Sequence, residues 1–181
     1  MSILVAVLGL ALLIFIHEGG HFLVALAVRM RPRSFNVGFG PPLLKIRRQG
    51  VEYAIRSIPL GGYVKIPGMH RAAPADVDAY FGRAVQAAPS LVGPSERLKR
   101  ALAAGDERAA VAELEALERE AARAGVPGVG RGVAELRDAL SPEAYWRQPA
   151  WKKIAVIFAG PATNLVFAVV LFAIVYMVAG G

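Results

Sequence analysis

Cysteine is absent from this chain of 181 residues. Its absence excludes a disulfide framework, a thiolate metal site and a cysteine nucleophile. A metal site in this protein would therefore use nitrogen and oxygen ligands.

Charged residues are also scarce. Only 19% of the residues are charged, whereas 55% are hydrophobic, and the mean hydropathy is +0.45. Soluble domains carry about 25% charged residues. The composition therefore predicts a membrane protein rather than a soluble domain.

Basic residues are missing from both ends of the chain. All 21 lysines and arginines lie between Arg29 and Lys153, and the formal net charge is +7. Basic residues at the ends of membrane spans stay in the cytoplasm, so we expect loop 29–153 to be cytoplasmic and both termini to be extracytoplasmic. This describes a multi-pass protein of the inner or plasma membrane. Because topology explains the basic excess, no nucleic-acid partner is expected.

Two long apolar segments flank that loop. The first, Ile3–Val28, has 26 residues and ends just before the first arginine. As a helix it would be about 39 Å long, enough to cross a bilayer with some tilt. A cleaved signal peptide is the alternative, but the segment has no basic n-region. The second segment runs from about Ala150 to Ala179, and we expect two transmembrane helices in contact with membrane lipid.

The first apolar segment contains three ionisable residues, His17, Glu18 and His21. On a helix, residues four apart lie on one face, so both imidazoles can reach a single cation. Glu18 points about 100° away and can take a proton from a water molecule at the metal without binding the metal itself. The pattern H-E-x-x-H indicates a zinc site, although iron or cobalt could also bind there.

A chance match is the competing explanation for this motif, because three polar residues could form hydrogen bonds inside a buried helix. An ionisable residue at bilayer depth costs at least about 2.5 kcal/mol. That cost favours a functional site, with His17 and His21 as Zn²⁺ ligands and Glu18 as the catalytic base.

Residues 29–68 carry short strand-like runs between glycines and prolines. Leu43–Arg48 and Val51–Ile58 flank Gln49-Gly50, a dipeptide suited to a tight turn. We expect a membrane-associated β-hairpin that enters the cytoplasmic side of the bilayer. A free strand edge there could pair with an extended substrate, or the hairpin could only plug the site.

Residues 69–148 are rich in Ala, Arg and Glu and have helical periodicity. They predict three or four short amphipathic helices, one of them capped by Asp106. The charges are mixed in sign, which indicates a solvated insert. His70, Asp76 and Asp78 lie far from the membrane motif, so we do not expect them to bind metal.

The final part of the chain, 149–181, contains the second apolar segment. Ahead of it, Ser141 followed by Pro142 predicts a helix start. Within it, Pro161 has no N–H for the helix and predicts a kink. Asn164 needs a hydrogen-bond partner in lipid, either on the first helix or on a substrate backbone.

The predicted fold is a mainly α membrane protein whose two transmembrane helices enclose a re-entrant β-hairpin region and a helical cytoplasmic insert. The expected divisions are residues 1–28 for the first transmembrane helix with its motif, 29–68 for the hairpin region, 69–148 for the insert and 149–181 for the second transmembrane helix.

Several stretches of this sequence resemble the site-2 protease family of intramembrane zinc metalloproteases, in particular the branch of the bacterial regulator of sigma-E protease. The stretches that carry the resemblance follow one another in the family's order: HEGGHF at 17–22, VGFGP at 37–41, PLGGYVK at 59–65, WKK at 151–153 and AGPATN at 159–164. They cover both apolar segments and the hairpin. The insert from 76 to 140 carries no family motif.

The resemblance implies cleavage of peptide bonds within transmembrane segments of membrane proteins, for example anti-sigma factors. Zinc would be held by His17 and His21, with Glu18 as the base. Transmembrane protein substrates would then be the partners of this protein.

In such enzymes the hairpin is thought to guide the substrate. Gly61, Gly62 and Tyr63 are therefore candidate substrate-binding residues, together with Asn164 on the second apolar segment.

The family's third zinc ligand is an aspartate in a Leu-Asp-Gly motif on a later helix, and an extracytoplasmic PDZ domain often follows the second helix. This sequence contains neither, and residues 154–178 have no carboxylate or histidine. Catalytic zinc usually takes three protein ligands. We therefore expect the N-terminal part of a zinc metalloendopeptidase. The alternative is a truncated, non-catalytic pseudoprotease or a metal-binding membrane protein that binds transmembrane partners.

Overall fold

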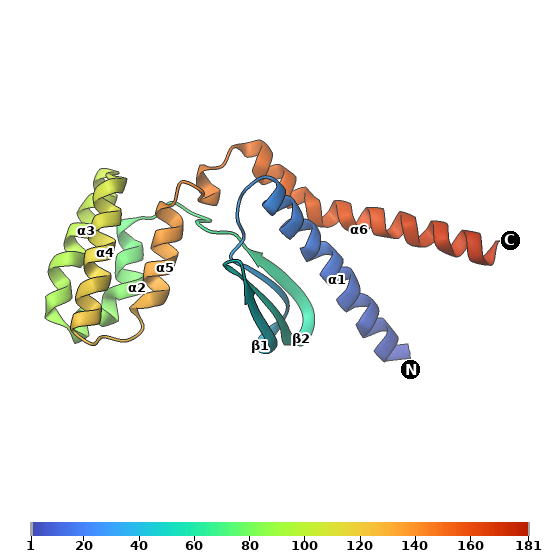
Figure 1. Ribbon diagram of the computed structural model, residues 1–181, viewed down its shortest axis with the longest axis horizontal. Coiled ribbons are helices and arrows are strands. Elements are labelled where there is room, and N and C mark those ends of the chain that lie inside the picture. Colours follow the sequence, from blue (N-terminus) through green and yellow to red (C-terminus); the bar gives the residue numbers. More distant parts are fainter. Residues whose placement is uncertain (1, 181) are drawn as a thin grey trace. The chain divides into compact units, whose positions relative to one another are not determined.

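Residues 2–180 are described by a computed structural model, which is mostly helical and contains one two-stranded antiparallel sheet (Figure 1). Its regular elements are α1 (Ser2–Ala27), β1 (Ser34–Arg48), β2 (Val51–Lys65), α2 (Pro74–Ala87), α3 (Val92–Ala104), α4 (Glu107–Arg123), α5 (Val129–Leu140) and α6 (Ala150–Ala179), with short 3₁₀ turns at Pro89–Leu91 and Tyr145–Arg147.

The chain divides into two compact units. One comprises Met1–Ile66 and Gln148–Gly181, and we call it the terminal unit because it is built from both ends of the chain. The other, Pro67–Arg147, contains α2–α5 and is called the bundle unit.

Helices α1 and α6 of the terminal unit are each long and apolar enough to cross a membrane. Their most apolar windows have mean hydropathies of 2.2 and 2.3. Many of their large apolar side chains are exposed, as Ile3, Phe172 and Val178 illustrate. α6 continues as a helix through Pro161. An exposed apolar surface of this kind suits a lipid environment, as the composition predicted.

Strands β1 and β2 form the predicted hairpin. The turn residues Gln49 and Gly50 have φ angles of 50° and 81°, which suit a two-residue type I′ turn. Beside the turn, the strands pair antiparallel from Arg48–Val51 to Leu44–Ile55.

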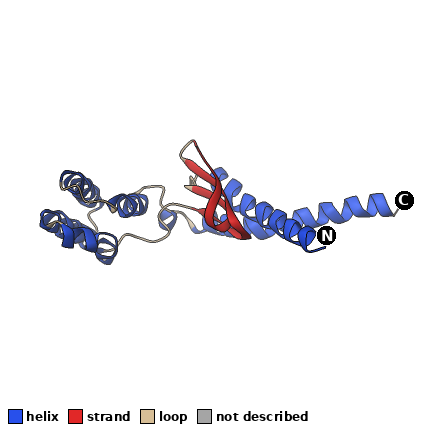
Figure 2. Cartoon of the chain, turned by 90° about the horizontal axis from the view of Figure 1, so that it is seen from below, coloured by secondary structure: helices blue, strands red, loops and turns tan. Residues whose placement is uncertain are grey.

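Both strands bend beyond this first stretch of pairing, and the sheet, red in Figure 2, folds back on itself. The bends contain glycines with positive φ, for example Gly38 in β1 and Gly61 in β2. As a result, residues 34–37 lie between residues 52–55 and residues 62–65. The strands are longer than the sequence predicted, because such a glycine bends a strand without ending it.

The bundle unit has an apolar core shared by its four helices. The buried residues of this core are Ala72, Val77, Phe81, Leu98, Ala101, Ala110, Leu114, Leu117, Val133, Leu136, Ala139 and Leu140. Asp106 caps α4 as predicted, because its Oδ1 accepts a hydrogen bond from the Ala109 N–H at 3.0 Å. The four helices agree with the predicted helical insert.

The predicted helix start at Ser141 is wrong. Ser141 is the C-cap residue that follows α5, and its Oγ accepts a hydrogen bond from the Glu143 N–H at 3.1 Å. The next α-helix begins only at Ala150, after Pro149. The residue that precedes a proline is disfavoured in a helix, so a helix that began at Ser141 would be interrupted at Gln148, before Pro149.

Candidate metal centre

Helix α1 presents two different faces within the terminal unit. One face carries His17 and His21 toward α6, and Gly20 on the same side is so close to α6 that an added Cβ would lie 2.5 Å from Thr163 Oγ1. The other face carries Glu18 toward the hairpin. The turn of about 100° per residue explains why neighbouring residues meet different elements. The candidate ligands and the candidate base are thus held by different parts of the unit.

The two imidazoles meet at their Nε2 atoms, which lie 3.2 Å apart. The ring planes are inclined at 82° and the centroids are 4.8 Å apart. Two nitrogen ligands on a tetrahedral zinc, each bonded at about 2.0–2.1 Å, are separated by about 3.3 Å. His17 and His21 therefore fit two corners of a zinc site.

His21 is held on its far side by α6. Its Nδ1 lies 2.6 Å from the backbone carbonyl oxygen of Val156. A carbonyl oxygen can only accept a hydrogen bond, so Nδ1 carries the proton and donates it. The lone pair of the neutral ring is then on Nε2, the atom that faces His17. Histidines that bind metals commonly use their second nitrogen in this way.

Asn164 contacts the other histidine. Its side-chain amide nitrogen lies 3.3 Å from Nδ1 of His17. The sequence predicted that Asn164 would contact either the first helix or a substrate backbone, and in the structure it contacts α1. A role for Asn164 in substrate binding stays a prediction.

The close approach of α6 depends on Gly160. A Cβ at this position would collide with Nε2 of His21 and would lie 2.7 Å from Nε2 of His17. Nearby, Thr163 Oγ1 lies 2.8 Å from the carbonyl oxygen of Gly160 and 3.2 Å from that of Ile16 on α1. The stretch around Pro161 therefore shapes the surroundings of the histidine pair.

Glu18 lies against strand β2. A Cβ on Gly62 would be 2.7 Å from Glu18 Cγ and 3.3 Å from its Cδ. The same position would be 2.7 Å from the carbonyl oxygen of Asn36 on β1. The predicted base and one predicted substrate-binding residue are thus in direct contact.

Aromatic contacts hold the hairpin on this face of α1. Phe35 of β1 makes edge-to-face contacts with Phe15 and Phe22, at centroid distances of 5.8 and 5.3 Å. Phe22 makes another with Tyr53 of β2 at 5.7 Å. Such pairs contribute about 0.5–1.5 kcal/mol each beyond the area they bury. Because Phe15 and Phe22 lie one turn to either side of Glu18, they fix the strands beside its carboxylate.

Arg56 was not identified from the sequence, yet it connects several parts of the hairpin. Its guanidinium donates to Asn36 Oδ1 at 3.0 Å, to the Gly40 carbonyl oxygen at 2.7 Å and to the Tyr63 hydroxyl at 3.1 Å. A single arginine in a largely apolar strand is the sequence signal that could have found it. Tyr63 lies in the doubled-back part of β2 and Gly61 in the bend before it, and their binding of substrate stays a prediction.

A third metal ligand is not found beside the histidine pair in residues 2–180. No group of three or more His, Asp or Glu residues in that range is placed to hold a metal. In the bundle unit, His70 Nε2 lies 3.6 Å from Asp76 Oδ2, and Asp78 pairs with Lys99 at 2.5 Å. These residues form separate pairs rather than a metal site.

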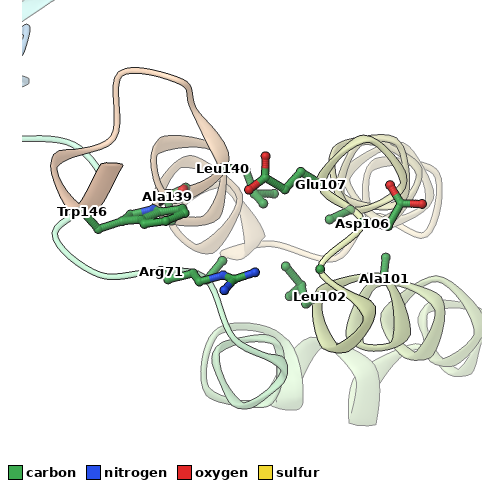
Figure 3. Close-up of a pocket in the computed structure, with 11 residues that line it drawn as sticks. Arg71, Ala101, Leu102, Asp106, Glu107, Ala139, Leu140 and Trp146 are labelled. Carbon is green, nitrogen blue, oxygen red and sulfur yellow. Dashed lines mark hydrogen bonds between the residues drawn. The ribbon is translucent and has the colours of Figure 1, made fainter. Parts of the chain in front are cut away.

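A small pocket near the core of the bundle unit is lined in part by Arg71, Glu107 and Trp146 (Figure 3). The guanidinium of Arg71 lies 5.7 Å from the centre of the Trp146 ring. The pocket's volume of about 10 Å³ is close to that of a single water site. It is too small to accept a peptide or a cofactor.

Comparisons with known proteins agree with the histidine motif. Residues 5–180 match the profile of Peptidase family M50. Relatives that carry the name "Putative zinc metalloprotease" include proteins of Chlamydia pneumoniae, 33% identical over 98% of this chain, and Chlamydia trachomatis serovar D, 33% identical over 97%. A relative of the same name from Brucella suis is 27% identical over 94% of this chain.

The chain spans about a fifth to a third of the length of these relatives, with coverages of 20%, 20% and 32%. The family match itself extends over nearly the whole chain and includes α1, the hairpin and α6. This chain therefore belongs to peptidase family M50, the site-2 proteases.

Proposed function

We propose that this chain supplies the histidine pair and the general base of an intramembrane zinc metalloprotease, which cleaves peptide bonds within transmembrane segments of other proteins. The observation that carries the proposal is the 3.2 Å separation of the His17 and His21 Nε2 atoms beside Glu18. Family membership and the names of the relatives support zinc as the metal.

Metal binding and proton transfer are assigned to different residues of this chain. His17 and His21 would hold the ion from one face of α1, while Glu18 remains outside the ligand set and can exchange protons with the reacting groups. Zinc in this position would polarise the scissile carbonyl and activate a water molecule for attack. Glu18 would take a proton from the attacking water and deliver it to the leaving amine.

A third protein ligand is needed for a catalytic zinc site. The described residues of this chain do not supply one beside the pair. The region of the relatives that this chain does not cover is the natural source, and the aspartate that the family resemblance implies would complete the site.

The substrate is expected to meet the site in extended form. Backbone carbonyls of a transmembrane helix are used in its own hydrogen bonds, so the helix must unwind locally before cleavage. The doubled-back strand 62–65 lies at one edge of the sheet and contacts Glu18 through Gly62. We infer that this edge holds the unwound segment, with the basic loop ends on the cytoplasmic side.

The direct test is cleavage of a reporter transmembrane substrate in membranes that contain the natural protein or its Glu18→Gln variant. Loss of a general base commonly reduces the rate by about 10²–10⁴-fold, and we expect a loss of that size. Glu52→Gln is the matched control, because Glu52 lies on the hairpin and pairs with Lys45 at 2.8 Å. Cleavage by Glu18→Gln at the wild-type rate would refute the proposed mechanism.

The non-catalytic alternative predicts a different pattern. A metal-binding pseudoprotease would cleave no transmembrane substrate in either form, while it still bound zinc through the histidine pair.

A further inference from the structure

We propose that Asn164 is a positioning residue for the metal site, which accommodates both neutral forms of His17 and selects the one that binds the ion. The inference rests on the proposed metal site and assigns to α6 a role that the H-E-x-x-H motif does not include. It follows from the hydrogen bonds around the two rings and from one buried oxygen atom.

The carbonyl of Val156 fixes the starting point of the hydrogen-bond chain. It requires a proton on Nδ1 of His21, at 2.6 Å, and leaves the lone pair on Nε2 of the neutral ring. The facing Nε2 atom of His17, at 3.2 Å, can then donate its proton to this lone pair. In that state His17 Nδ1 is an acceptor and receives a hydrogen bond from the amide nitrogen of Asn164 at 3.3 Å.

This arrangement is consistent for the neutral rings without metal, but it leaves one atom unpartnered. Within residues 2–180, Oδ1 of Asn164 is buried and makes no hydrogen bond. A buried acceptor without a hydrogen bond is destabilising. The oxygen of the Asn164 amide is therefore unused. Rotation about the bond that carries the amide would bring this oxygen to Nδ1 of His17.

Rotation of the Asn164 amide by 180° exchanges its oxygen and its nitrogen. Oδ1 then accepts a hydrogen bond from Nδ1–H of His17, and Nε2 presents its lone pair toward Nε2 of His21. Two facing lone pairs at this distance repel each other unless a cation lies between them. The rotated amide therefore suits the metal-bound form, and the original orientation suits the metal-free form.

The proton balance of this change is simple. His17 loses the proton on Nε2 and gains one on Nδ1, so the ring is neutral in both states. An amide can serve both forms because it has a donor and an acceptor, whereas a carboxylate can only accept and leucine can do neither. A residue that only joined the two helices would not influence which nitrogen carries the proton.

The experiment measures zinc affinity by chelator competition in the natural protein purified in detergent. Loss of an outer partner typically weakens metal binding by about 10–100-fold, and we expect a loss in that range for Asn164→Leu. Asn164→Asp keeps the acceptor for Nδ1–H and should bind zinc at least as tightly as the wild type. Leu165→Ala is the matched control. Leu165 is next to Asn164 in the sequence, but its side chain is 68% exposed, so this variant should bind zinc with the wild-type affinity.

Nitrogen NMR of the histidine rings gives a second readout that does not depend on activity. In the zinc-free wild type we expect His17 to carry its proton on Nε2, and in the zinc-loaded wild type on Nδ1. Wild-type zinc affinity in Asn164→Leu, or a proton on Nδ1 of His17 in the zinc-free wild type, would overturn the proposal. Failure of the wild type itself to bind zinc would instead contradict the proposed function, and the wild-type tautomer would still test the inference about Asn164.

Discussion

The terminal unit and the bundle unit distribute their side chains in opposite ways. In the bundle unit, the apolar residues Phe81, Leu98 and Leu117 are fully buried, while charged residues form ion pairs at the surface. In the terminal unit, large apolar residues such as Phe172 and Val178 are exposed. Its imidazoles lie instead where α1 meets α6, with hydrogen bonds to both Val156 and Asn164.

The difference reflects two different solvents. Apolar burial drives the folding of the bundle unit, whose charged surface suits water. Lipid tails are as apolar as the side chains of α1 and α6, so helix contact there depends on close packing and on hydrogen bonds. The same contacts that hold these helices together therefore also orient the candidate metal ligands.

The largest expected effect comes from removal of a core side chain in the bundle unit. Phe81 is fully buried, and Phe81→Ala should destabilise the bundle by about 3–5 kcal/mol. Phe172 is 75% exposed, and Phe172→Ala should alter stability by less than about 0.5 kcal/mol. The lipid or detergent that surrounds this side chain is as apolar as the ring and can take its place. Thermal unfolding of both variants in detergent measures the contrast, and equal destabilisation would contradict it.

A change at the closest contact between α1 and α6 should abolish metal binding. In Gly160→Val the Cβ collides with Nε2 of His21 and lies 2.7 Å from Nε2 of His17, so we expect zinc affinity to fall by about 100-fold or more. Gly19→Ala is the control, because no atom lies within 4 Å of its added Cβ. Zinc competition measures both variants, and tight zinc binding by Gly160→Val would show that α6 does not enclose the pair.

A smaller effect is expected on the hairpin side of α1. Gly62→Ala would displace Glu18, and a misplacement of about 1 Å can reduce the rate by about 100-fold. Because the atoms nearest to an added Cβ on Gly62 belong to Glu18 and Asn36, zinc affinity should stay at the wild-type value. Cleavage and zinc assays on Gly62→Ala and on Leu60→Ala, whose side chain is exposed, separate the two effects. Loss of zinc binding in Gly62→Ala would contradict the division of α1 into two faces.

The smallest effect concerns a surface ion pair of the bundle unit. The hydrogen bond from Lys99 to Asp78, with a second to Glu96, raises the pKa of Lys99 above its ordinary value of 10.5. The associated stability is present below pH 10.5 and is lost as the pH rises through the raised pKa. Lys99→Met should therefore lower the melting temperature slightly at pH 8 and converge with the wild type in strong alkali. Lys45→Met, in the terminal unit, should leave the bundle transition unchanged.

The sequence predicted the local features of the site well. Helical spacing put His17 and His21 on one face with Glu18 turned away, and Gln49-Gly50 predicted the hairpin turn. These features depend on residues close in sequence. The contacts of Val156 with His21 and of Gly62 with Glu18 join residues far apart in the chain, so periodicity and spacing could not reveal them.

The role of Arg56 could not be predicted from the sequence for another reason. A single arginine in an apolar strand signals a buried partner but does not say which one, and the bends at Gly38 and Gly61 bring its partners together.

The central claim is that His17 and His21 hold one zinc ion through their Nε2 atoms. X-ray absorption at the zinc edge, on the natural protein purified with one equivalent of zinc, tests it directly. We predict two imidazole nitrogens at about 2.0–2.1 Å, one fewer imidazole in His21→Ala, and no change in Glu18→Gln. A spectrum without imidazole ligands, or one that His21→Ala leaves unchanged, would contradict the account.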